Sequence, residues 1–402
     1  MNHTLRVAVA SALIALPFPA VVAAQGKIEL PVSLAELQQR AVADSNDAVA
    51  HYNLALGYWN AKKWDDVQHS LDEALRLDPR LAVARLALSQ LPFARQPKIR
   101  EEIFEATGPL PDEYLDILRD TDREWRHAFM IDPMVDLRIL AATTSIGVDI
   151  GLIEDVIGPV WGNYFRAAVN CYEGQYDLCD QRFRRVVQDF QDAGPGLRVP
   201  DGVYFLKGLA AARVGQYDAA IDDFEVLLKR EEDRKKKMNE RDLVRVPLQL
   251  NEYRFFIASL THASGKAADA VKRYREVAEN DLGLYMAHVR MANIYESQRD
   301  YPRAIEERNR AVNANPDDGT LHLELGITLG KSGDFAGAED ACRRATERIP
   351  RHAEAWFWLG LALEQQGKRD EARAAYQKVV ELAPSRLKAR ATVAAQKVAA
   401  LQ

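Results

Sequence analysis

Apolar and small side chains recur along the C-terminal half of the chain at intervals that fit paired helices. The segment 353–384, AEAWFWLGLALEQQGKRDEARAAYQKVVELAP, has Leu-Gly at its seventh and eighth places, glycine at its fifteenth, alanine at its twentieth and proline at its thirty-second. Apolar residues three or four places apart form one face of a helix. The pattern therefore predicts two amphipathic helices, separated near the glycine and ended by the proline.

The same intervals recur with a period of 34 residues, in repeats that begin at 251, 285, 319 and 353. Small residues at the eighth and twentieth places let two helices approach closely, and larger residues fill the space around their crossing. Looser copies begin at 48, near 160 and at 201. Each hairpin leaves an apolar side bare, which a neighbouring hairpin covers, so the pattern predicts a stacked array.

This arrangement resembles the tetratricopeptide repeat family, whose repeats are antiparallel helix hairpins. The resemblance covers about 48–90 and 160–400, and it implies an all-α, right-handed superhelical solenoid. We expect an N-terminal helix with the first hairpins in 25–91, degenerate repeats with insertions in 160–250, four repeats in register in 251–384 and a capping helix in 385–402. Residues 92–159 have a helical pattern but no repeat phase, so we expect an atypical helical segment there.

The first residues predict export from the cytoplasm. Arg6 is followed by an apolar run, and small residues at 22–24 suit a signal peptidase cut before Gln25. Pro17 and Pro19 interrupt the run before it reaches the roughly 20 apolar residues that span a bilayer, which argues against an uncleaved anchor. We expect a signal peptide over 1–24, a periplasmic or secreted location and no integral membrane segment after cleavage.

Composition and motifs favour binding over catalysis. A net charge of −6 offers no broad basic face, so we expect no nucleic-acid partner. The stretch GITLGKSG has one residue too few for a phosphate loop, and its glycines already fit the repeat. His288 and His322 share the fourth place of adjacent repeats, where hydrogen-bonded, buried imidazoles are favoured over a metal pair. We therefore predict a non-enzyme that needs no cofactor or metal.

In the resembled family, the first helices of successive repeats line a concave groove. Its fifth place is apolar in every repeat of this chain, and mostly aromatic. We interpret this stripe as a groove for a peptide or protein segment. The polar residues at its rim that would orient the partner are Arg290, Asn293, Glu324, Glu354 and Glu364. The alternative is that the stripe only packs helix against helix. The candidate partner-binding residues are Phe205, Phe255, Phe256, Val289, Arg290, Asn293, Leu323, Phe357 and Trp358.

Cys171 and Cys179 lie on either side of the turn predicted at Gly174. In an oxidising compartment they would form a disulfide across their hairpin; otherwise they are small packing residues. Cys342 is expected to be a buried thiol.

The sequence thus predicts a non-catalytic scaffold that binds a peptide or protein segment in its concave groove. The alternative is a soluble subunit of a bacterial envelope assembly that docks through its outer face or its charged insert. That insert lies within 229–245, which holds eight basic and five acidic residues. Such runs are usually a solvated helix extension, although a basic stretch can also bind an acidic partner or a phospholipid surface.

Overall fold

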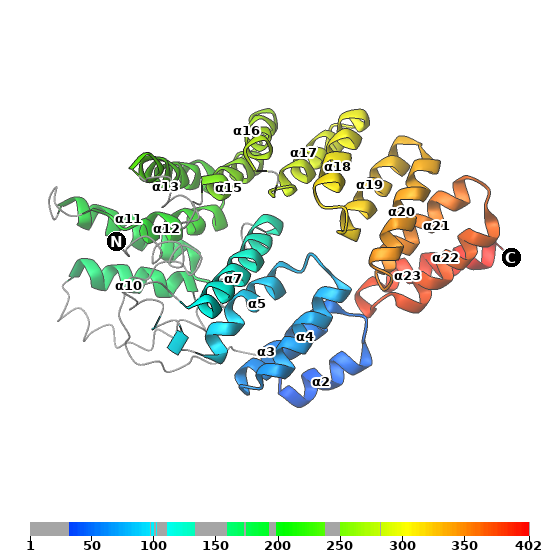
Figure 1. Cartoon of the computed structure of the whole chain (residues 1–402), viewed down its shortest axis with the longest axis horizontal. Coiled ribbons are helices and arrows are strands. Elements are labelled where there is room, and N and C mark those ends of the chain that lie inside the picture. Colours follow the sequence, from blue (N-terminus) through cyan, green and yellow to red (C-terminus); the bar gives the residue numbers. More distant parts are fainter. Residues whose placement is uncertain are drawn as a thin grey trace. The chain divides into compact units, whose positions relative to one another are not determined.

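The computed structural model describes residues 32–96, 98–99, 102, 111–132, 159–172, 174–192, 198–237, 250–281 and 283–401 (Figure 1). Within these ranges every regular element is a helix, and no strand occurs, which confirms the all-α prediction. None of the helices in the described ranges is both long and apolar enough to cross a membrane. The predicted signal peptide, residues 1–24, lies outside the described residues.

The chain divides into two compact bodies, which we describe separately. The central body contains Arg85–Arg273, and the terminal body contains Leu30–Ala84 together with Tyr274–Gln402. Helices α5 (Ala82–Arg95) and α16 (Ala267–Asn280) cross the two boundaries.

The terminal body is a series of helix hairpins in which consecutive helices contact one another. Its helices are α2 (Leu34–Ala43), α3 (Ala48–Asn60), α4 (Trp64–Leu77), α17 (Met286–Ser297), α18 (Tyr301–Ala314), α19 (Gly319–Ser332), α20 (Phe335–Arg348), α21 (Ala353–Gln365), α22 (Arg369–Leu382), the short 3₁₀ helix η1 (Ser385–Leu387) and α23 (Lys388–Ala400).

The central body contains hairpins of the same type and one helix, α7, outside the repeat pattern. Besides most of α5 and half of α16, its helices are α7 (Asp112–Ile131), α10 (Pro159–Tyr172), α11 (Tyr176–Asp192), α12 (Asp201–Arg213), α13 (Tyr217–Lys237) and α15 (Leu250–Ala263). Of the atypical segment 92–159, the structure describes the end of α5 and α7 but not residues 133–158. Within the charged run, α13 continues as a helix through Lys237. Lys235, Lys236 and Lys237 are exposed, whereas Glu231 is buried and pairs with Arg234, and residues 238–245 lie outside the described residues.

The hairpins form for the reasons that the repeat pattern gives. A side chain at Gly360, in the eighth place, would bring a Cβ within 2.8 Å of the Tyr376 ring, so only glycine allows this approach. Gly333, in the fifteenth place, ends α19 with a φ of 92°, a conformation that glycine adopts without strain. Lys62 and Arg299 take the same left-handed conformation where the repeats beginning at 48 and 285 lack that glycine.

Candidate partner-binding surface

Six of the nine candidate groove residues are buried in the interior of the array rather than open to a partner. This set, which is apolar throughout, consists of Phe205, Phe255, Phe256, Val289, Leu323 and Phe357. Phe357 illustrates their role: its ring lies edge-on to Tyr376 of the next helix, and the Arg390 guanidinium covers it at 4.3 Å. For these six residues the structure favours the packing alternative.

The other three candidates retain solvent-accessible surface in the terminal body. Asn293 is exposed, and Arg290 and Trp358 are half-buried. Trp358 packs against two clusters, the one that contains Leu323, with the half-buried Ile327, and the one that contains Phe357. Trp358 is therefore the one aromatic candidate that keeps part of its ring near solvent, at the sixth place of the first helix of its repeat.

A buried arginine organises the polar residues of adjacent repeats in the terminal body. Arg308, only 5% exposed, extends from α18 and donates hydrogen bonds to Asn293 and to Glu324. Glu296 lies 3.6 Å from Arg308 and also accepts a hydrogen bond from Thr328 at 3.0 Å. We call Asn293, Glu296, Arg308, Glu324, Thr328 and Lys331 the Arg308 network.

Charges within the Arg308 network are mutually compensated. Burial alone would raise the pKa of Glu296, but hydrogen bonds from Lys331 and Thr328, together with the charges of Lys331 and Arg308, lower it below its ordinary value. Glu324 also forms an ion pair with Arg80, from the N-terminal part of the same body. The network thus joins α17, α18 and α19 through paired charges.

Two further acidic residues that the sequence placed at the groove rim also have partners within the terminal body. Glu354 pairs with Arg390 at 2.8 Å, and Glu364 pairs with Lys397 at 2.8 Å. Both cations belong to α23, the last helix. The rim charges therefore bind the chain's own C-terminal helix.

In the central body, α7 packs against the first helix of a repeat, α15 (Figure 1). Phe129 of α7 lies edge-on to Phe256, with ring centroids 5.3 Å apart. Arg126 of α7 forms an ion pair with the buried Glu252 at 2.6 Å. Burial raises the pKa of Glu252 above its ordinary value, and the Arg126 charge opposes this rise. The hydrophobic pattern could show that α7 is amphipathic, but not which helix it contacts.

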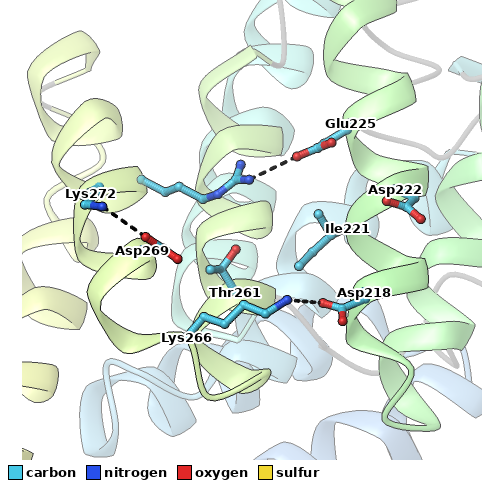
Figure 2. A pocket seen from close by; sticks show the side chains of 9 residues that line it. Asp218, Ile221, Asp222, Glu225, Thr261, Lys266, Asp269 and Lys272 are labelled. Carbon is cyan, nitrogen blue, oxygen red and sulfur yellow. Dashed lines mark hydrogen bonds and ion pairs between the residues drawn. The ribbon is translucent and has the colours of Figure 1, made fainter.

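A surface pocket of about 510 Å³ opens between α13 and α16 in the central body (Figure 2). Nearly all of its lining side chains are charged, and most are already paired. Lys266 pairs with Asp218 at 2.7 Å, and Arg273 with Glu225 at 3.1 Å. Asp222 is exposed beside them. Apart from Thr261 of α15, the lining residues belong to α13, to α16 and to the turn before α16.

The structure joins Cys171 and Cys179 in a disulfide, with their Cα atoms 5.1 Å apart. The bond connects α10 to α11 across the turn at Gly174, whose φ is 75°. Cys342 is a buried free thiol, and burial raises its pKa to about 12. A thiol with such a pKa is not a nucleophile at neutral pH.

The histidines at the fourth place of adjacent repeats form hydrogen bonds with different groups. His288 Nδ1 lies 2.6 Å from a carboxylate oxygen of Glu307, and His322 Nε2 lies 2.9 Å from the carbonyl oxygen of Pro316. No cluster of three metal-ligating side chains occurs among the residues that the structure describes. Their hydrogen bonds agree with the interpretation of these histidines as structural.

The fold and surface define a class: an all-α array of helix hairpins in which the buried aromatic residues at the fifth place pack between helices. The tetratricopeptide repeat family model matches residues 263–319 and 323–386. Residues 263–386 therefore contain tetratricopeptide repeats, as the 34-residue period indicated.

Similar proteins match the chain over limited stretches. Protein O-mannosyl-transferase TMTC1 of Homo sapiens is 25% identical over 137 residues, which are 33% of this chain and 16% of that protein. Small glutamine-rich tetratricopeptide repeat-containing protein 2 of Mycosarcoma maydis is 34% identical over 89 residues, 22% of this chain and 25% of that protein. The chain thus spans a quarter or less of these relatives' length. The crystal structure of MamA matches this chain with 21% sequence identity and a TM-score of 0.37. The match covers 46% of this chain and 96% of the MamA chain.

Proposed function

We propose that the chain is a non-catalytic scaffold that binds a peptide or protein segment at first-helix faces of its terminal body. The observation that carries this proposal is the half-buried Trp358, which lies on the same helix as the exposed Gln365. A partly accessible tryptophan is a frequent anchor of protein interfaces. The proposed anchor thus differs from the buried phenylalanines, because a partner can reach it.

We also propose a periplasmic or secreted location. The disulfide between Cys171 and Cys179 supports this, because such bonds persist mainly in oxidising compartments.

A second candidate function is docking of an envelope assembly on the outer surface of the central body. The charged pocket between α13 and α16 and the exposed basic end of α13, at Lys235–Lys237, favour it. Charged surfaces of this kind steer association and set its salt dependence more than they set affinity.

The two candidates are separated by capturing binding partners from a periplasmic extract with the full chain and two variants. One variant carries Trp358→Ala and Gln365→Arg; the other carries Asp222→Arg and Lys272→Glu, both exposed residues of the charged pocket. Circular dichroism verifies that each is folded. We expect a partner that the wild type and the pocket variant retain and the Trp358 variant loses. Loss with the pocket variant alone would instead support docking on the outer surface.

A further inference from the structure

Helix α7 buries one continuous face although it belongs to no repeat. Its buried side chains include Thr121, Trp125, Ala128 and Phe129, which are spaced as one side of a helix. Trp125 and Phe129 stack on each other, with ring centroids 5.2 Å apart and planes within 10°. The opposite side carries exposed charges, among them Arg119 and Arg123. Helix α7 is thus an amphipathic helix laid on another surface.

The surface that receives it is a face of α15. Phe256, almost fully buried, lies between two rings: Phe224 meets it edge-on at 4.4 Å, and Phe129 meets it at 5.3 Å. Phe224 belongs to the preceding hairpin, so that contact is part of the array. Phe129 comes from outside the array and extends this series of rings, and Trp125 in turn stacks on Phe129.

The buried carboxylate of Glu252 requires a positive charge from the helix that covers this face. The side chain of Glu252 is 7% exposed, Arg126 is its ion-pair partner, and its second carboxylate oxygen has no hydrogen-bond partner. A buried carboxylate left without a cation is strongly destabilising. Any helix that covers this face must therefore bring a positive charge to Glu252 and an aromatic ring to Phe256.

We propose that the face of α15 formed by Glu252 and Phe256 is a docking site for an amphipathic helix, and that α7 is its occupant in cis. The partner is a helix that presents an arginine, an aromatic residue just before it and another three positions after it, as Trp125, Arg126 and Phe129 do. The inference rests on the proposed scaffold function and adds a second binding site with a defined partner chemistry.

The two halves of α7 are held differently, which allows such an exchange. Its first half packs against Phe93 of α5 and against Ile99 just beyond that helix, through Tyr114, Leu115, Ile117 and Leu118. Arg85 of α5 also pairs with Glu124, early in the second half of α7, at 2.9 Å. The residues after Glu124, Arg126 and Phe129 among them, carry the contacts with α15. A partner that replaces only those contacts leaves the attachment to α5 in place, and it competes against the local concentration of α7.

A labelled peptide with the sequence of residues 111–132 tests this site by fluorescence anisotropy. The full chain carrying Arg126→Ala and Phe129→Ala opens the face of α15, and we expect it to bind the peptide at least tenfold more tightly than the wild type does. Arg119→Ala, on the exposed side of α7, is the matched control and should bind the peptide as the wild type does. Equal, weak binding to the wild type and to the opened variant would overturn the proposal.

Exchanging the charges at positions 126 and 252 tests whether the site requires a positively charged partner. Adding Glu252→Lys to the opened variant should abolish binding of the peptide, and a peptide with Arg126→Glu should restore it. Binding that ignores residue 252 would overturn the assignment. Arg126→Gln alone is a milder variant, for use if the opened one does not fold, and it should bind the peptide at least threefold more tightly than the wild type. If the opened variant forms dimers and Glu252→Lys abolishes them, the face binds a second copy of this chain instead.

The failure of this inference is distinguishable from failure of the proposed function. Trp358→Ala lies in the terminal body and should leave peptide binding at α15 unchanged. If the peptide does not bind but Trp358→Ala still removes the captured partner, only the α15 inference fails.

Discussion

Two groups of repeats stack their helices by different means. The first group begins at 285, 319 and 353, and the second begins near 160 and at 201. The former keep the small residues and helix-ending signals of the 34-residue rule, and their additional contacts are compensated charges such as the Arg308 network. The latter depart from the spacing, and a disulfide joins the two helices of one of their hairpins. The covering helix α7 of the same body contacts α15, in the regular repeat beginning at 251. The irregular spacing is thus accompanied by a covalent bond that the regular repeats lack.

The largest expected effect is in the regular repeats, at Arg308. Arg308→Ala should lower the free energy of unfolding by about 3 kcal/mol, because it removes the hydrogen bonds that the buried guanidinium donates to Glu324 and Asn293. Glu324 keeps its ion pair with Arg80, and Glu296 keeps its ion pair with Lys331. Urea denaturation measures the change. Arg310→Ala, on the same helix with its side chain half exposed, is the control and should cost less than about 1 kcal/mol. Similar losses for the two variants would show that the network does not hold these repeats together.

In the irregular repeats the corresponding test is the disulfide. Replacing Cys171 and Cys179 with alanine should lower stability by about 2–3 kcal/mol, because the bond restricts a short loop of the unfolded chain. A thiol titration of the denatured, unreduced protein should find one free thiol, that of Cys342. Three free thiols would contradict the bond.

Overpacking a regular hairpin tests the small-residue rule itself. Ala338→Leu should cost about 1–3 kcal/mol, because Ala338 is almost fully buried at the twentieth place, where two helices meet. Thermal denaturation measures the effect. Val380→Leu, at an exposed position in α22, should leave the melting temperature nearly unchanged. A tolerated leucine at 338 would contradict the assigned register.

The irregular repeats should also respond to pH through Asp223. Burial raises the pKa of this carboxyl from 3.8 to about 6, although Lys207 opposes the rise. The folded protein therefore holds a proton more tightly than the unfolded chain does, so stability falls as pH rises between about 4 and 6. The loss is on the order of 1–3 kcal/mol, and Asp223→Asn should remove it. Urea denaturation at pH 4.5 and 7 compares the two proteins; an identical pH dependence would exclude Asp223 as its source.

Local rules were sufficient to predict the regular repeats. The proline at 384, the glycine at 333 and the alanine at 338 each act within one hairpin, so their spacing predicted helices α19 to α22 and the all-α class. The sequence could not show whether the aromatic stripe binds a ligand or packs between helices. Phe357 has the same spacing whether it faces a ligand or Tyr376, and only the packing of the next helix decides between them.

The docking of α7 was beyond sequence reasoning for a different reason. The contact between Arg126 and Glu252 joins residues 126 positions apart and follows no repeat. Its residue types, an arginine and a glutamate, are ordinary on solvated helix faces. Only their burial, with Phe129 on Phe256, reveals a site.

The most direct test of the account is a double-mutant cycle between Phe129 and Phe256. Unfolding free energies are measured by urea denaturation for the wild type, Phe129→Ala, Phe256→Ala and the double variant. If α7 lies on α15, the two substitutions are coupled, and the aromatic pair should contribute an interaction energy of about 0.5–1.5 kcal/mol. Strictly additive losses would contradict the docking of α7, and with it the proposal that this face of α15 accepts a helix.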